Sequence, residues 1–167
     1  MESAVAVWYY DDLVRRSLLR YKFHGKRHYA KAYGRLLAMK ISRAELEYDL
    51  VTWVPVSRRR RRSRGYDQVE LLASAVCAEL GTEKVCCLRK IRHNPPQSGI
   101  TGQAQRRANV LGVYDAVNPA CLAGKRVLLL DDIITTGATL SECARVLLTA
   151  GASQVHCAAV AAVRNQK

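Results

Sequence analysis

The fold is decided by residues 127–139, which read VLLLDDIITTGAT. Four apolar residues in succession are typical of a parallel strand that is covered on both faces of its sheet. The polar segment after them leads into a helix, for which we expect Thr139 to be the N-cap and Glu142 to complete a capping box. That helix has one apolar face and ends at Gly151, and residues 154–163 form the next buried strand. The unit is therefore strand, helix, strand, with a right-handed crossover.

A second unit of the same kind starts at residues 50–56, an apolar strand that is followed by the arginine-rich segment 57–65. We interpret that segment as a loop. A helix begins near Asp67, which has N-cap spacing to Glu70, and residues 84–88 give the following strand. Two such units predict an α/β fold with a mostly parallel sheet.

Two regions lie outside this pattern. Residues 11–24 and 28–41 are predicted to form amphipathic helices that cap one end of the sheet. Residues 89–109 contain two prolines and two glycines with little apolar periodicity, so we expect a flexible loop, and loops of that length usually act as lids or binding segments. A chain of 167 residues has room for one sizeable core. We therefore expect a single domain, with residues 1–45 as a hood and residues 46–167 as the core.

The charge of the chain indicates a polyanionic partner. It carries 27 Lys and Arg residues against 14 acidic residues, a formal net charge of +13, which suits phosphorylated metabolites, nucleic acid or an anionic membrane surface. The six cysteines have no CxxC spacing, so we expect neither a structural zinc site nor a disulfide framework. Residues 1–12 lack the basic start of a signal peptide, and polar residues interrupt the longest charge-free stretch. We therefore expect a cytoplasmic protein without a membrane span.

The polar segment after the strand at residues 127–130 suits a phosphorylated sugar. Ligands of open α/β sheets bind beyond the carboxyl ends of the strands, and small or hydroxyl residues there let backbone N–H groups point at a 5-phosphate at the start of a helix. The candidates for this phosphate are Thr135, Thr136, Gly137, Ala138 and Thr139. The carboxylates of Asp131 and Asp132 are better suited to accept hydrogen bonds from ribose hydroxyls or to act through Mg²⁺. The alternative is an ordinary strand-to-helix turn with solvated aspartates.

The same residues resemble the signature of the type I phosphoribosyltransferases, which is an apolar strand, two acidic residues, two apolar residues and a Thr-Thr-Gly loop. Further blocks, in similar order and over nearly the whole chain, resemble the ComF family (competence protein F, also GntX-like) of that superfamily. These blocks are Tyr21-Lys22-Phe23-His24-Gly25, Val54-Pro55-Val56, Arg64-Gly65-Tyr66-Asp67-Gln68, Gln97 and Arg106-Arg107-Ala108-Asn109-Val110. The resemblance implies a five-stranded parallel sheet under a small hood, dependence on Mg²⁺, and transfer of ribose 5-phosphate from phosphoribosyl pyrophosphate with release of pyrophosphate.

The sequence departs from the family pattern in several places. Many ComF proteins begin with a four-cysteine zinc module, which the present sequence lacks. Asp67 stands where the family usually has Asn. Thr135 stands where purine-salvage members of the superfamily often have an acidic residue that handles a base proton, which argues against a 6-oxopurine acceptor.

Positive charge for pyrophosphate is available in two segments. Six arginines lie between residues 57 and 65, more than one ligand can use, and the candidates are Ser57, Arg58, Arg64 and Gly65. The remaining arginines form a solvated face or a nucleic-acid patch. The expected lid carries five positive charges and no acidic residue, so its closure would stabilise the departing pyrophosphate and exclude water. The lid candidates are Arg92, Gln97, Arg106 and Arg107; the alternative is a surface loop without a catalytic part.

Three functions follow as hypotheses. The first is an active phosphoribosyltransferase that binds Mg-phosphoribosyl pyrophosphate and an unidentified acceptor. The second is an accessory protein of DNA uptake, which binds DNA or the competence machinery through its arginine face. The third is a sensor that binds phosphoribosyl pyrophosphate without turning it over. The sequence names neither the acceptor nor the oligomeric state, and a dimer is compatible with it.

Overall fold

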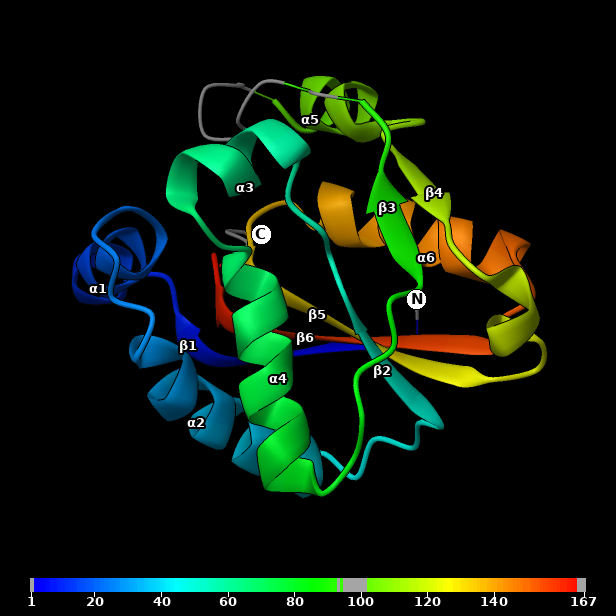
Figure 1. Ribbon diagram of the computed structural model, residues 1–167, viewed down its shortest axis with the longest axis horizontal. Coiled ribbons are helices and arrows are strands. Elements are labelled where there is room, and N and C mark those ends of the chain that lie inside the picture. Colours follow the sequence, from blue (N-terminus) through cyan, green and yellow to red (C-terminus); the bar gives the residue numbers. More distant parts are fainter. Residues whose placement is uncertain (1, 93, 95–101, 165–167) are drawn as a thin grey trace.

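A parallel sheet with the strand order β1-β6-β5-β2 lies at the centre of the computed structural model (Figure 1). Its strands are β1 (Ser3–Tyr9), β2 (Leu50–Trp53), β5 (Arg126–Ile134) and β6 (Gln154–Ala162). All three neighbouring pairs are parallel, so the carboxyl ends of the strands meet at one edge. The structure describes residues 2–92, 94 and 102–164.

Helices cover both faces of this sheet and divide the core in two. The face with Leu128 and Leu130 packs against α1, α2 and α4, whereas the face with Val127 and Leu129 packs against α6 and the antiparallel pair β3–β4. The helices are α1 (Asp12–Phe23), α2 (Tyr29–Arg43), α3 (Arg58–Arg64), α4 (Gln68–Leu80), α5 (Gln103–Val110) and α6 (Ala138–Thr149), and a short 3-10 helix spans Pro119–Leu122. The short strands are β3 (Leu88–Lys90) and β4 (Tyr114–Ala116). Successive side chains of β5 point to opposite faces of the sheet, and both faces are buried. Every position from 127 to 130 must therefore be apolar, which explains the unbroken apolar run. The α/β class with a parallel sheet is confirmed.

The first strand was not predicted. β1 lies at the edge of the sheet, beside β6, with Ser3 opposite His156 and Tyr9 opposite Ala162. The Ser3 hydroxyl lies 2.7 Å from Nδ1 of His156, so this buried histidine has a hydrogen-bond partner in the sheet, as expected of a core residue. An edge strand of this kind has no turn or helix signal of its own, since its partner comes from the other end of the chain.

The described part of the sheet has four strands, not the five that the family resemblance implies. Residues 84–88, predicted to be the next strand, make one parallel bridge, between Lys84 and Val51. The N–H of Val85 still donates to the carbonyl of Val51, at 2.8 Å. The N–H of Cys87, however, donates to the Thr52 hydroxyl at 3.3 Å, and a side chain thus replaces the next backbone acceptor. The ladder stops there and the chain turns into β3.

The arginine-rich segment is helix α3, so its interpretation as a loop was wrong. The Ser57 hydroxyl caps the helix by accepting from the N–H of Arg60 at 3.3 Å. Gly65, at φ 75°, ends it in the left-handed conformation, with its N–H bonded to the carbonyl of Arg61. Arginine is a good helix former, and with a cap at each end the run is helical despite its like charges.

The capping predictions have different outcomes for the two long helices. Asp67 does cap α4, because its Oδ1 accepts from the N–H groups of Val69 and Glu70. Thr139 does not cap α6, which begins one residue earlier behind Gly137 at φ 75°. Glu142 cannot complete a box there because its Oε1 accepts from the N–H of Gly112 at 2.9 Å.

Both described ends of the expected lid, residues 89–109, belong to regular elements. The segment starts on β3, where Lys90 pairs with Tyr114 of β4, and it ends in helix α5. Gln, Ala and Arg in α5 are helix formers that the search for apolar periodicity passed over. Among the described helices, none combines the length and the hydropathy that crossing a bilayer requires.

Helices α2 and α4 lie unusually close together. A Cβ atom added to Gly34 of α2 would come within 2.4 Å of the Cβ of Ala75 in α4. Tyr33, which directly precedes Gly34, makes edge-to-face ring contact with Tyr21 of α1, at a centroid distance of 5.4 Å. The α2–α4 contact therefore supports α1, which lies over the carboxyl edge of the sheet (Figure 1).

Candidate functional site

A cleft of about 650 Å³ opens at the carboxyl ends of β2 and β5. It is lined by residues of α1, α3, α4, α5 and the β3–β4 pair, together with the segment that follows β5. The charged side chains that line it are Lys22, Arg60, Arg64, Lys90, Arg106, Asp131 and Asp132. Among the described residues, five cations against two carboxylates make the cleft suited to an anionic ligand.

The two carboxylates lie on the floor of the cleft and are almost fully buried. Asp131 is 8% exposed and Asp132 is 6% exposed, because both belong to the last part of β5, an interior strand that lies between β6 and β2 in the sheet. Oδ1 of Asp131 accepts from the N–H of Asp132 at 2.8 Å. Burial, with the Asp132 carboxylate beside it, raises the pKa of Asp131 well above its usual range. A ligand that donates hydrogen bonds here would favour the ionised form.

Asp132 is held by two donors from different helices. Its Oδ2 lies 2.9 Å from Nζ of Lys22 in α1 and accepts from Nε2 of Gln68 in α4 at 3.0 Å. Oε1 of the same glutamine accepts from Nη1 of Arg64 at 2.7 Å. The amide of Gln68 therefore connects Arg64 to Asp132, and these contacts determine which way the amide points. The hydroxyl of Tyr21 donates to the backbone carbonyl of Gln68, which fixes the start of α4 against α1.

Lys22, Phe23 and Arg64 form one side of the cleft, which we call the hood wall. The guanidinium of Arg64 lies over the Phe23 ring, 4.6 Å from its centroid, and 61% of Phe23 is exposed. Burial lowers the pKa of Arg64, although Asp132 opposes this effect. The hood wall therefore offers an ammonium group, a guanidinium group and an aromatic ring at one place.

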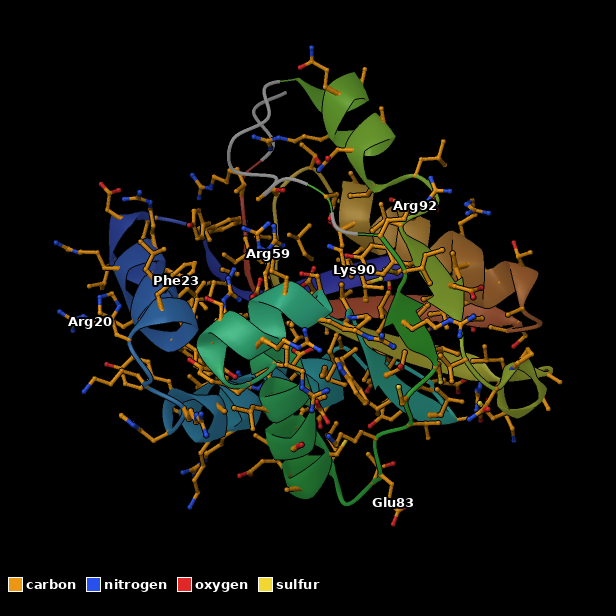
Figure 2. The ribbon with its side chains drawn as sticks, turned by 45° about the horizontal axis from the view of Figure 1, so that its top comes forward. Arg20, Phe23, Arg59, Glu83, Lys90 and Arg92 are labelled. Carbon is orange, nitrogen blue, oxygen red and sulfur yellow. The ribbon has the colours of Figure 1, made fainter. Side chains whose placement is uncertain are left out.

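Arg60, Lys90 and Asn94 form the other side, which we call the lid wall. Nη2 of Arg60 donates to the backbone carbonyl of Asn94 at 3.4 Å, and Nζ of Lys90 donates to the Tyr114 hydroxyl at 3.5 Å. Burial, followed by the charge of Arg60, lowers the pKa of Lys90 to about 8. Figure 2 labels Phe23 on α1 and Lys90 on β3, with α3 between them, and α3 itself contributes Arg64 to the hood wall and Arg60 to the lid wall.

The structure brings several predicted residues together at the start of α6. Thr135 and Thr139 line the cleft next to the two aspartates. Gly137 turns the chain at φ 75°, and the N–H of Ala138 points back to the Thr136 hydroxyl at a long 3.5 Å. The segment has the shape of a tight loop at a helix N-terminus, which is where an anion is favoured.

Not all of the residues predicted to bind pyrophosphate line the cleft. Arg64 lines the cleft, whereas Ser57 is buried as the cap of α3 and Gly65 forms the helix end. Arg58 is exposed and is not among the residues that line the cleft; from the same helix, Arg60 is.

Of the predicted lid residues whose side chains the structure describes, one lines the cleft. Arg106 of α5 lines it, and Arg92 is exposed beyond the end of β3. Gln97 and the side chain of Arg107 lie outside the described residues.

Sequence reasoning missed four functional candidates, which are Lys22, Arg60, Gln68 and Lys90. Lys22 and Gln68 stand in blocks shared with the ComF family, which was the available signal, but no local spacing connects either residue to Asp132. Lys90 was counted with the lid charges and not placed in the cleft.

The aspartates are also the candidate ligands for a metal. Within the described ranges no group of three or more His, Cys, Asp or Glu side chains is arranged to hold an ion. Two buried carboxylates with hard oxygen atoms fit a Mg²⁺ ion that takes its other ligands from phosphate groups and water.

Comparison with known proteins agrees with the geometry. Residues 69–167, more than half of the chain, match the phosphoribosyl transferase domain family. The chain is 26% identical over 162 residues to competence protein F of Haemophilus influenzae, covering 93% of this chain and 70% of that protein. It is 30% identical over 150 residues to competence protein ComFC of Streptococcus pneumoniae, covering 90% of this chain and 64% of that protein, so it spans less than two thirds of this relative.

Among solved structures, glutamine phosphoribosylpyrophosphate amidotransferase from B. subtilis, complexed with ADP and GMP, is similar with a TM-score of 0.55. The sequence identity is 26%, and the match covers 83% of this chain and 30% of that one. The resemblance to the ComF family and to the type I phosphoribosyltransferase fold is confirmed.

Proposed function

The chain belongs to the phosphoribosyl transferase domain family, and as its function we propose that it binds Mg-phosphoribosyl pyrophosphate in the cleft and transfers ribose 5-phosphate to an acceptor. The observation that carries this proposal is the buried pair Asp131 and Asp132, which directly precedes a phosphate-sized loop at the start of α6. The cations on both sides of that pair suit a ligand with a phosphate at one end and a pyrophosphate at the other.

Different residues bind the 5-phosphate, the ribose and the pyrophosphate of the ligand. Backbone N–H groups of residues 135–139 and the N-terminus of α6 bind the 5-phosphate. Asp131 and Asp132 accept hydrogen bonds from the ribose hydroxyls, which fixes the sugar relative to the sheet. Arg60, with Lys90 beside it, binds the pyrophosphate from the lid wall. This assignment replaces the exposed Arg58 with Arg60.

The proposed reaction is a displacement at C1 of the ribose. The acceptor donates an electron pair to C1, the bond between C1 and the pyrophosphate oxygen breaks, and its electrons leave with pyrophosphate; a proton on the acceptor atom goes to water. Positive charge builds on the sugar, where the Asp131–Asp132 pair stabilises it, and negative charge builds on the leaving group, where Arg60 and Lys90 stabilise it. A magnesium ion, when bound to the pyrophosphate, supplies further neutralisation of that charge.

Calorimetry with Mg-phosphoribosyl pyrophosphate tests the binding step. Asp132→Asn keeps the shape of the site but removes the charge, and we expect affinity to fall at least about tenfold, since hydrogen bonds to charged groups contribute about 1.5–3 kcal/mol. The matched control is Asp115→Asn, an exposed carboxylate that pairs with Arg89 away from the cleft. Equal affinity of both variants with the unaltered protein would contradict the assignment of the site. Binding without pyrophosphate release from any acceptor would identify a sensor instead of a transferase.

A second function is favoured by one further observation, the outer surface of α3. Arg58, Arg59, Arg61 and Arg62 are exposed there, on the same helix as the cleft residues Arg60 and Arg64; Figure 2 labels Arg59 on α3. Two curated relatives are named competence proteins, and we propose as the alternative that this surface binds the phosphate backbone of DNA during uptake. Arginine side chains on one helix face suit contacts with successive phosphates.

The alternative has its own measurement. Binding to a single-stranded oligonucleotide should weaken steeply with added salt, because it releases counterions, and Arg58→Gln with Arg62→Gln should reduce the slope by about 0.7 for each phosphate that is no longer neutralised. Lys40→Gln with Arg43→Gln, near the far end of α2, is the control that removes the same charge. Oligonucleotide binding that does not change with salt concentration would reject the role of α3. The same holds if the pair of substitutions in α3 and the control pair in α2 change the salt dependence equally.

A further inference from the structure

The acceptor side of the cleft has a recognisable chemistry. We propose that the hood wall binds an acceptor that carries a carboxylate on a planar aromatic ring, and that Lys22 selects it once the sugar of the donor has taken Asp132. This inference rests on the proposed function, because it needs the ribose hydroxyls to bind the two aspartates.

Binding of the donor should weaken the ion pair between Lys22 and Asp132. Nζ of Lys22 lies 2.9 Å from Oδ2 of Asp132, the same oxygen atom that accepts from Gln68. A ribose hydroxyl that donates to this carboxylate competes with the ammonium group for its lone pairs. The hydroxyl is neutral, so it cannot replace the charge that Lys22 loses. Lys22 is 18% exposed, and a half-buried cation whose partner is engaged elsewhere needs a new anion.

The new anion for Lys22 comes from the acceptor, not from pyrophosphate. The proposed function places pyrophosphate on the lid wall, where Arg60 and Lys90 line the cleft. In the proposed arrangement Asp132 holds the C2 hydroxyl, which is next to C1 of the ribose. Lys22, beside Asp132, is then also close to whatever attacks C1. An acceptor with a carboxylate next to its nucleophilic ring therefore supplies the missing partner for Lys22.

The hood wall also has a surface that suits a planar ring. Phe23 is 61% exposed and has the Arg64 guanidinium over its ring. An exposed aromatic ring and a planar guanidinium provide a surface on which another planar ring can stack, and Arg64 can donate to a carboxylate as well. Among the described residues that line the cleft, the only carboxylates are Asp131 and Asp132, so nothing on the hood wall favours a cationic acceptor.

The reaction keeps the carboxylate intact. A ring nitrogen of the acceptor forms the bond to C1, pyrophosphate leaves with the electrons of the C1–O bond, and any proton on that nitrogen goes to water. Because Lys22 is released only when the donor binds, the order of binding is donor first and acceptor second.

The test uses matched probes that differ in the carboxylate. Nicotinate is compared with nicotinamide, and orotate with uracil, by calorimetry and by pyrophosphate release, with and without saturating Mg-phosphoribosyl pyrophosphate. We expect the carboxylate member of at least one pair to bind at least tenfold more tightly than its neutral partner, and only when the donor is present. Lys22→Gln should remove this preference, whereas Lys22→Arg should retain most of it. The control is Arg20→Gln, which removes a cation from the exposed side of α1, away from the cleft (Figure 2).

The outcomes separate the two proposals. If the donor binds but neutral probes bind as well as carboxylates, or no carboxylate binds, or Lys22→Gln keeps the preference, the inference is wrong and the proposed function stands. If the unaltered protein does not bind Mg-phosphoribosyl pyrophosphate, the proposed function is wrong and the inference falls with it.

Discussion

The two walls of the cleft hold their cations in different ways. On the hood wall, Lys22 lies 2.9 Å from Asp132 and Arg64 donates to Gln68 at 2.7 Å. On the lid wall, Arg60 reaches a backbone carbonyl at 3.4 Å and Lys90 reaches a tyrosine hydroxyl at 3.5 Å. Short, charge-assisted contacts fix a side chain before the ligand arrives, whereas long contacts to neutral groups leave it free to adjust. The hood wall is thus preorganised around the sugar carboxylates, and the lid wall can follow a leaving group.

Replacing Gln68 should show the largest effect of this difference. Gln68→Met removes the link between Arg64 and Asp132, and leaving a buried polar group without its partner costs about 1–3 kcal/mol. We expect affinity for Mg-phosphoribosyl pyrophosphate to fall about 10- to 100-fold in calorimetry.

The matched control for this change is Glu79→Gln, on the exposed side of the same helix. If Gln68→Met binds the donor like the control does, the hood wall is not preorganised through Gln68.

Crowding the support of the hood wall should act on stability. Gly34→Ala places a methyl group 2.4 Å from the Cβ of Ala75, so α2 and α4 must separate. Overpacking of this kind costs about 1–3 kcal/mol in the free energy of unfolding, which urea denaturation measures. The double variant Gly34→Ala with Ala75→Gly should recover most of the loss. A single variant as stable as the unaltered protein would mean that the two helices can move apart freely.

Lys90 should make ligand binding at the lid wall dependent on pH. Its pKa is about 8 in the empty cleft, below the usual lysine value, because burial disfavours the charged form. The side chain is mostly protonated at pH 7 and mostly neutral at pH 9, so affinity for Mg-pyrophosphate should decrease as the pH rises through 8. Lys90→Met should bind about tenfold more weakly at pH 7, because one charged hydrogen bond is absent, and should show a flatter profile.

The profile of Lys22→Gln is the comparison for Lys90→Met. It should still decrease between pH 7 and pH 9, because Lys90 is intact. A profile that is already flat in the unaltered protein would exclude Lys90 from the pyrophosphate site.

The smallest effect is expected at Asp67, which caps α4 and also binds the segment between β2 and α3. Both oxygens of Asp67 act as acceptors, Oδ1 for Val69 and Glu70 and Oδ2 for the N–H of Val56 at 3.0 Å. Asp67→Asn introduces the residue usual in the ComF family, but its NH₂ group cannot accept from Val56. We expect a loss of about 1 kcal/mol in the free energy of unfolding. A gain in stability would show that the amide finds a different arrangement here.

Much of the core was predictable because its signals are local. The strand, loop and helix around Asp131 and Asp132 follow from one continuous run of residues, and Asp67 was identified as a cap from its position alone. Lys22 was not placed at Asp132, since that contact joins helix α1 to strand β5 and depends on how α1 packs across the sheet. β1 was missed for the same reason, because its partner β6 is at the other end of the chain.

The errors near the cleft have a different origin. The arginine run was interpreted through its charge, although its propensity and its Ser57 and Gly65 ends favour a helix. That change matters for function, because a helix turns Arg60 and Arg64 toward the cleft and leaves Arg58 outside it. A loop would have given no reason to choose among the six arginines.

The direction of β1 decides how the protein is best attached to a surface. The strand starts at Ser3, beside His156 near the amino end of β6, and runs toward Tyr9 and the cleft. A linker or fluorescent reporter joined ahead of Ser3 would therefore project from the side of the molecule opposite the cleft, whereas one joined after Ala162 would stand close to its mouth. Immobilisation through the amino-terminal side leaves the ligand path open for single-molecule or biosensor work.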